Sequence, residues 1–103
     1  MSRQAIIVKT RTQPGKREEV LTAYQEHLAP RAAANDDQEL VVWSADDHDP
    51  DVFYLFEVYR SAEAMQANSQ QPWFFEYLGT VGPLLDGEPE VTLASPGWAK
   101  GLD

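Results

Sequence analysis

The candidate functional residues of this 103-residue chain lie between positions 54 and 77. Glu57 falls within Val52 to Tyr59, an aromatic and β-branched run typical of a strand, so one carboxylate lies among side chains that prefer burial. Asn68 and Trp73 follow on a helical stretch and supply neutral hydrogen-bond donors, which suit a flat, oxygen-bearing aromatic ligand in a mostly apolar pocket. We predict that Glu57 and Asn68 are catalytic and that the substrate is bound by Trp73, Tyr77 and Tyr54.

Each of these residues also has a structural interpretation. The aromatic residues of the helical stretch have the spacing of the apolar face of a core helix, formed by Trp73, Phe74, Tyr77 and Leu78. Asn68 could end a helix, and Glu57 could be a strand carboxylate that is hydrogen-bonded to a turn. The sequence leaves both interpretations open.

The elements that position these residues can be placed from local signals. Ser61 can cap the start of a helix that carries Glu63 in its first turn, where the helix dipole favours negative charge. Pro72 can occupy the first turn of a second helical segment. A strand and two helical segments therefore follow one another without a long loop.

The N-terminal third is expected to contain a strand and a helix. A short apolar run within Arg3 to Thr12 predicts a central strand that is buried on both faces. Gly15 can then cap a helix, which Pro30 should kink and Asn35 should end.

Two more strands are expected, at Glu39 to Ser44 and at Glu90 to Ser95. The acidic segment Asp46 to Asp51 should form the turn of an antiparallel hairpin between the second and third strands. The tail from Pro96 to Asp103 has no periodicity, but we expect its Trp98 to pack against the protein or a partner subunit, because an exposed indole forfeits a large apolar burial.

The order β-α-β-β-α-β predicts an α+β fold, with a ferredoxin-like sheet and both helices on one face. The strands carry apolar residues at both odd and even positions, as at Ile7 and Val8, and these point to opposite faces of the sheet. The face without helices should therefore be apolar too and need a cover. A homodimer packed face to face would provide it. We expect one domain over residues 1–95, followed by a tail over residues 96–103.

The central stretch resembles the antibiotic biosynthesis monooxygenase family. The matching residues follow the central motif of that family without gaps, and they are Glu57, Tyr59, Ala67, Asn68, Pro72, Trp73, Phe74, Pro83, Leu84 and Leu85. Two positions differ, because the family pattern has histidines where this chain has Asn68 and Trp73. The resemblance covers roughly residues 4 to 94 and implies a dimeric α/β barrel.

The resemblance also implies a chemistry. Members of this family oxidise quinol-like or polycyclic aromatic substrates with molecular oxygen and with no metal, flavin or haem, because the deprotonated substrate itself passes an electron to oxygen. The protein then only has to promote ionisation and exclude water. With neither motif histidine present, the candidate base is Glu57, while Asn68 and the Trp73 indole could stabilise the developing oxyanion.

Two other functions remain open at this stage. The chain could be a non-catalytic small-molecule binding or interaction module on the same dimeric scaffold, which the loss of both motif histidines favours. A haem-degrading relative would need a histidine ligand after the tryptophan, and residues 74–103 contain none.

Composition restricts the partners and the compartment. A formal charge of −9 should repel phosphate backbones and anionic lipid, so we expect neither nucleic acid nor membrane as a partner. The absence of cysteine excludes disulfides and thiolate metal sites. The N-terminus lacks a signal-peptide pattern, and the longest apolar run is far short of the roughly 20 residues of a spanning helix, so we expect a cytoplasmic protein.

The two histidines lie outside the predicted site. His27 is expected at a helix surface or at the edge of the core. His48 lies in the acidic segment, whose spacing does not match that of an EF-hand, so a solvated turn is expected there rather than a metal site. We predict no metal and no other cofactor.

Overall fold

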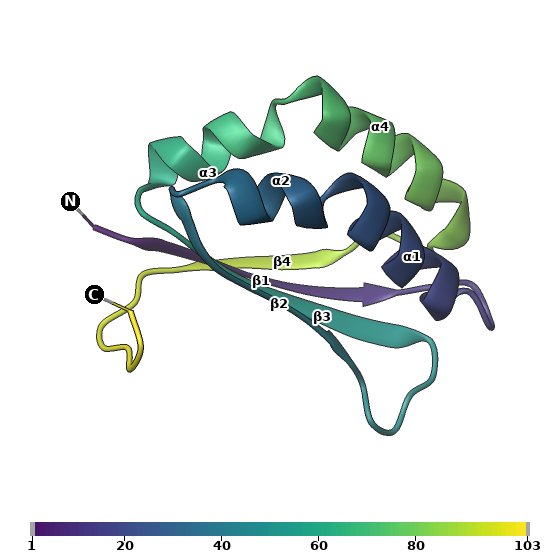
Figure 1. Ribbon diagram of the computed structural model, residues 1–103. Helices are drawn as coiled ribbons and strands as arrows, with labels where there is room; N and C mark the ends of the chain where they lie inside the picture. The colour runs from purple at the N-terminus through teal and green to yellow at the C-terminus, as the bar shows by residue number, and fades with distance from the viewer. Residues whose placement is uncertain (1, 103) are drawn as a thin grey trace.

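The computed structural model describes residues 2–102 and shows a four-stranded sheet with helices on one face (Figure 1). The strands are β1 (Gln4–Arg11), β2 (Gln38–Ala45), β3 (Val52–Tyr59) and β4 (Glu90–Ala94). They lie in the order β2-β3-β1-β4, and each neighbouring pair is antiparallel. The predicted α+β, ferredoxin-like fold is therefore confirmed.

The second crossover begins as its sequence signals predict. Helix α3 (Ala62–Ser69) is capped by Ser61, whose Oγ accepts a hydrogen bond from the Ala64 backbone N–H at 3.1 Å. Helix α4 (Pro72–Val81) has Pro72 in its first turn and is followed by the short 3₁₀ helix η1 (Gly82–Leu84). None of the helices within residues 2–102 is both long enough and apolar enough to cross a membrane.

The first crossover differs from the prediction at one proline, Pro30, and one glycine, Gly15. It consists of helices α1 (Arg17–His27) and α2 (Ala29–Ala34), so Pro30 does not kink one helix but lies in the first turn of a second one. A proline costs no helical hydrogen bond at that position. Gly15 does not cap α1, because Lys16 precedes the helix and Gly15 makes the preceding turn with a φ of 76°. Asn35 ends α2, as predicted.

The core lies between the helices and one face of the sheet. Its buried residues come from α1, β3 and α4, and among them are Val20, Tyr24, Phe53, Tyr77 and Val81. Trp43 of β2 stacks on Phe53, with ring centroids 4.6 Å apart. The helical layer is thereby fixed over the centre of the sheet.

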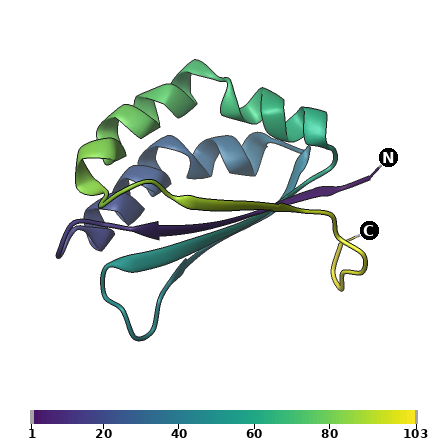
Figure 2. The ribbon, with the colours of Figure 1, turned by 180° about the vertical axis from the view of Figure 1, so that it is seen from behind.

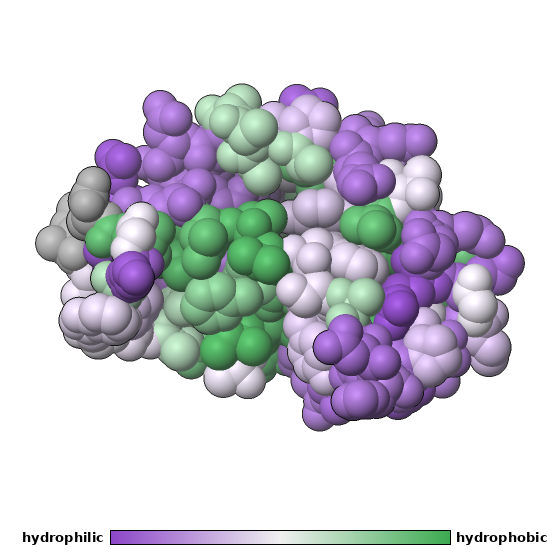
Figure 3. Space-filling model, turned by 60° about the horizontal axis from the view of Figure 1, so that its bottom comes forward, coloured by the Kyte–Doolittle hydropathy of each residue, from purple (hydrophilic) through white to green (hydrophobic). Residues whose placement is uncertain are grey.

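Within residues 2–102 no helix covers the opposite face of the sheet, and the tail after β4 borders one end of it, at the buried residues Ala5 and Val58. Ile7, Val42 and Phe56 lie on this face and are 39%, 44% and 40% exposed. Figure 3 shows hydrophobic side chains gathered there. The prediction that β1 is buried on both faces is therefore wrong for the single chain, because all the helices lie on one side.

The acidic segment forms the turn of the β2–β3 hairpin, as predicted. Arg17 of α1 holds this turn: its Nη1 donates to the backbone oxygens of Asp46, Asp49 and Val52 at 3.1, 2.9 and 3.1 Å. His48 is exposed at the turn. Within residues 2–102 no group of three or more acidic, histidine or cysteine side chains is placed to hold a metal ion.

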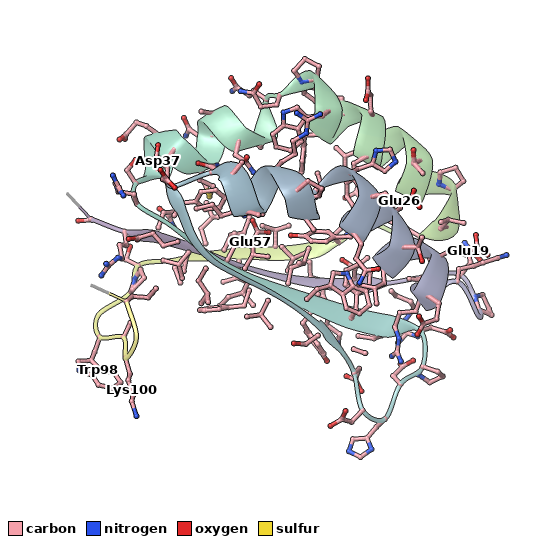
Figure 4. All side chains as sticks on the ribbon, viewed as in Figure 1. Glu19, Glu26, Asp37, Glu57, Trp98 and Lys100 are labelled. Atoms are coloured by element: carbon pink, nitrogen blue, oxygen red, sulfur yellow. The ribbon has the colours of Figure 1, made fainter. Side chains whose placement is uncertain are left out.

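The tail after β4 turns away from the helices, with Trp98 and Lys100 pointing into solvent (Figure 4). Trp98 is 84% exposed, so it does not pack against its own chain. The tail has no strand partner after Ala94 that would hold the indole on the sheet. The alternative, that Trp98 packs against a partner subunit, stays a prediction.

Candidate active site

A cavity of about 270 Å³ lies between the sheet and the helices and contains Glu57 in its wall. Figure 4 shows Glu57 between the two layers. The cavity walls come from the four strands below and from α1, α2, α3 and α4 above. Of the predicted site residues, the structure brings four together in these walls: Glu57, Asn68, Trp73 and Tyr77.

The two oxygens of the Glu57 carboxylate have different surroundings. Oε1 accepts hydrogen bonds from Tyr59 Oη at 2.7 Å and from Gln38 Nε2 at 2.8 Å. Oε2 accepts none from the residues that the structure describes. Oε2 is not fully enclosed either, because among the described residues the one fully enclosed side-chain nitrogen or oxygen without a partner is Trp43 Nε1. Oε2 is therefore accessible. Because Glu57 lines the cavity, Oε2 is the oxygen that a bound ligand can reach.

Burial raises the pKa of the Glu57 carboxyl above its ordinary value, and the hydrogen bonds from Tyr59 and Gln38 offset part of this effect. Among the described residues that line the cavity, Glu57 is the one that carries a formal charge. A carboxylate in such surroundings is a stronger proton acceptor than one in water.

A hydrogen-bonded chain runs from Glu57 towards the molecular surface. The Tyr59 hydroxyl donates to Glu57 Oε1 and accepts from Asn68 Nδ2 at 3.0 Å. Asn68 Oδ1 accepts in turn from Asn35 Nδ2 at 3.4 Å. Gln38 closes the chain into a ring, since its Nε2 also donates to Tyr59 Oη at 3.0 Å. These groups fix the rotamer of Glu57 and the direction of its free oxygen.

Asn68 therefore acts on Glu57 through Tyr59 in this structure. Its amide hydrogen bonds lead to Tyr59 and Asn35. It lies in the last turn of α3, but the residue that ends the helix is Gln70. The helix-ending interpretation of Asn68 is thus replaced by a place in the hydrogen-bonded chain.

Three aromatic side chains offer neutral donors to the cavity: Tyr24, Trp73 and Tyr77. None of their polar atoms is hydrogen-bonded to another residue within positions 2–102, and none is fully enclosed. Burial, and then the charge of Glu57, raise the pKa of Tyr77 to about 12 and also raise the pKa of Tyr24. Both phenols thus keep their protons at neutral pH and can donate to an oxygen of a ligand.

Tyr54 does not belong to this site. Successive strand residues point to opposite faces of a sheet, so residues 54 and 57 cannot share one. Tyr54 lies on the face away from the helices, where its hydroxyl donates to Asp46 Oδ2 at 2.6 Å. The predicted substrate-binding role of Tyr54 is therefore corrected: this side chain closes the β2–β3 hairpin.

Sequence reasoning missed the roles of Tyr59 and Gln38. Tyr59 lies two residues after Glu57 and therefore on the same face of β3, which the alternation of strand residues could have indicated. Gln38 pairs with Tyr59 across the hairpin, but the register is shifted between Gln38 and Leu40. No local signal in the sequence announces that shift.

Comparison with known proteins gives a family and a set of relatives. The sequence profile of the family described as antibiotic biosynthesis monooxygenase matches residues 3–77. A search of curated proteins finds no match.

Solved structures share the fold over nearly the whole chain. A candidate antibiotic biosynthesis monooxygenase from Chloroflexus aurantiacus is 24% identical with a TM-score of 0.85, over 99% of this chain and 100% of that one. Another from Nitrosomonas europaea is 15% identical with a TM-score of 0.88, over 97% and 95% of the two chains. Rv0793 from Mycobacterium tuberculosis is 25% identical with a TM-score of 0.81, over 97% and 99%.

Proposed function

This chain belongs to the antibiotic biosynthesis monooxygenase family, and from that premise we propose that it is a cofactor-independent monooxygenase that oxidises a quinol-like or polycyclic aromatic substrate with molecular oxygen. One observation carries the proposal. A carboxylate oxygen with no hydrogen-bond partner among the described residues, Glu57 Oε2, is accessible from a cavity whose walls are otherwise uncharged and largely aromatic or aliphatic.

Glu57 is the proposed general base. Its Oε2 takes the acidic proton of a phenol or of an activated methylene group, while Oε1 stays bound to Tyr59 and Gln38. The raised pKa brings the carboxyl closer to that of the substrate and so lowers the cost of the proton transfer. The apolar walls exclude water that would otherwise solvate and weaken the base.

The electrons for oxygen reduction come from the substrate. The phenolate or carbanion passes one electron to molecular oxygen, and the two radicals join through a new carbon–oxygen bond. The resulting peroxide anion takes back the proton that Glu57 removed. The hydroperoxide then loses water, so that one oxygen atom stays in the product as a carbonyl and the other leaves as water. No external reductant is needed for this balance.

Tyr24, Tyr77 and Trp73 are the proposed ligand-binding donors. Their neutral hydroxyl and indole N–H groups could bind the oxygen on which negative charge develops after deprotonation. Tyr59 and Asn68 are positioning residues, since their hydrogen bonds lead to Glu57 Oε1 rather than to the open part of the cavity.

We further propose that the chain forms a homodimer through the uncovered face of the sheet. The exposed apolar side chains of Ile7, Val42 and Phe56 support this assembly, because water contact with such a patch is unfavourable. A dimeric α/β barrel is also what the sequence resemblance implies.

Oxygen uptake with a panel of anthrones and hydroquinones tests the catalytic proposal. The wild type should consume oxygen with at least one substrate, and label from ¹⁸O₂ should enter the product. Tyr59→Phe should slow turnover by about tenfold or more, because Glu57 loses a hydrogen bond that orients it. Tyr54→Phe, the same change on the other face of β3, should leave the rate unchanged.

Equal rates for Tyr59→Phe and Tyr54→Phe would contradict the assigned roles. Ligand binding without oxygen uptake across the whole panel would instead indicate a non-catalytic binding module on this scaffold.

A further inference from the structure

One end of the cavity takes no part in the proposed chemistry. Leu78 of α4 and Val91 of β4 line the cavity, yet these side chains are 43% and 56% exposed. Residues that face both the cavity and the solvent mark an opening. This opening lies between α4 and β4, the two elements nearest the viewer in Figure 2.

Apolar side chains continue from this opening onto the surface. Phe75 and Leu93 are 58% and 57% exposed. Phe75 lies one helical turn before Leu78, and Leu93 lies two residues after Val91 on the same face of β4. We call the set of Phe75, Leu78, Val91 and Leu93 the exit patch.

The exit patch lies across the sheet from Glu57. Leu93 pairs with Ile6 of β1, which pairs on its other side with Glu57 of β3. Neighbouring strands are about 4.8 Å apart, so Leu93 and Glu57 are separated by about 10 Å across the sheet. A single aromatic ring at Glu57 therefore leaves the opening unfilled, and a substituent of the ring has to cross the remaining distance.

We propose that the substrate is a phenol or quinol with an unbranched apolar substituent, which leaves the cavity between α4 and β4 and lies on the exit patch. The inference rests on the proposed function for the position of the ring at Glu57. It adds the substituent, for which the opening offers apolar contacts and, apart from Glu57 at the ring, no charged side chain among the described residues that line the cavity.

The exit patch is tested by the binding affinities of a series of 4-alkylphenols, from methyl to octyl, measured by titration calorimetry in the absence of oxygen. Each methylene that reaches the exit patch should strengthen binding about two- to fourfold. The double variant Leu78→Gln and Val91→Thr should abolish this gain and keep the affinity for 4-methylphenol within about twofold. Ala33→Thr, a change on the exposed side of α2 outside the cavity and the proposed dimer face, should retain the full dependence on chain length.

An affinity that is independent of chain length in the wild type would overturn the inference. The same conclusion would follow if the double variant changed the oligomeric mass but not the chain-length dependence, because a second copy would then cover the patch. The binding series needs no turnover, so its failure is distinguishable from failure of the oxidation itself.

Discussion

Glu57 acquires its chemical character from its neighbours rather than from its place in a motif. Burial raises its pKa, and the hydroxyl of Tyr59 and the amide of Gln38 occupy one of its oxygens. The other oxygen has no partner among the described residues and is accessible from the cavity. Under the proposed function, the Glu57 carboxylate takes the part of a base without a histidine at position 68 or 73.

The pH dependence of stability should report the buried carboxylate. Between the ordinary pKa of the unfolded state and the raised pKa of the folded state, the folded protein binds more protons, so stability falls as pH rises through this window. Glu57→Gln should therefore be more stable than the wild type at pH 7, and the gain should vanish below the ordinary pKa of a glutamate. Urea denaturation from pH 4 to pH 8 measures this difference.

The control is Glu39→Gln on the neighbouring strand. Glu39 is paired with Arg3 at 2.7 Å and does not line the cavity. Its loss should bring no gain at pH 7. Parallel stability curves for the wild type and Glu57→Gln would show that Glu57 has no raised pKa in the folded protein.

Part of the site could be predicted from the sequence, residue by residue. Glu57, Trp73 and Tyr77 stand out by residue type, and the structure places all three in the cavity wall. Tyr54 was assigned wrongly because the assignment ignored the alternation of strand residues, and the same alternation would have found Tyr59. Gln38 depends on a register shift in the hairpin, which only the folded backbone reveals.

At the scale of elements, the geometry of the proposed site depends on where helix α3 begins. Ser61 fixes the first turn of α3, and Asn68 near its end reaches back to Tyr59 on β3. Strand β3 and the starts of α3 and α4 could be predicted because aromatic and β-branched residues, a serine cap and a proline are strong local signals. The prediction for Pro30 was wrong because, in the sequence alone, a proline that starts a second helix cannot be told from a proline that kinks one long helix.

Ser61→Ala should lower the free energy of unfolding by about 1 kcal/mol, because the N–H of Ala64 loses its hydrogen-bond acceptor. Ser69→Ala on the same helix is the matched control, since that exposed hydroxyl only donates to the carbonyl of Gln66. It should cost about 0.5 kcal/mol or less. Equal losses in urea denaturation would argue that Ser61 does not stabilise the start of α3.

At the scale of the whole molecule, the layers leave most of one sheet face and the indole of the tail exposed to solvent. The uncovered face carries Ile7, Val42 and Phe56, and Trp98 of the tail is 84% exposed. The two-layer arrangement could be predicted from the order of elements, but the direction of the tail could not, because it has no periodic pattern.

Light scattering at micromolar concentration should give twice the chain mass of 11.6 kDa. Phe56→Asp should produce a monomer, since a charge would have to be buried in the interface. Ala33→Asp on the exposed side of α2 should remain dimeric.

In a variant with Trp98 as its only tryptophan, the fluorescence should be blue-shifted in the dimer. A monomeric wild type would exclude the proposed barrel.

The proposed role of Glu57 as the base is tested by the pH profile of kcat/KM for an oxidised substrate, measured for the wild type and for Glu57→Gln. In the wild type, kcat/KM should rise about tenfold per pH unit up to the raised pKa of Glu57 and then level off. In Glu57→Gln, this rise should disappear and the plateau should fall by about 10²- to 10⁴-fold. The same profile and the same plateau in both proteins would contradict the claim that Glu57 is the base.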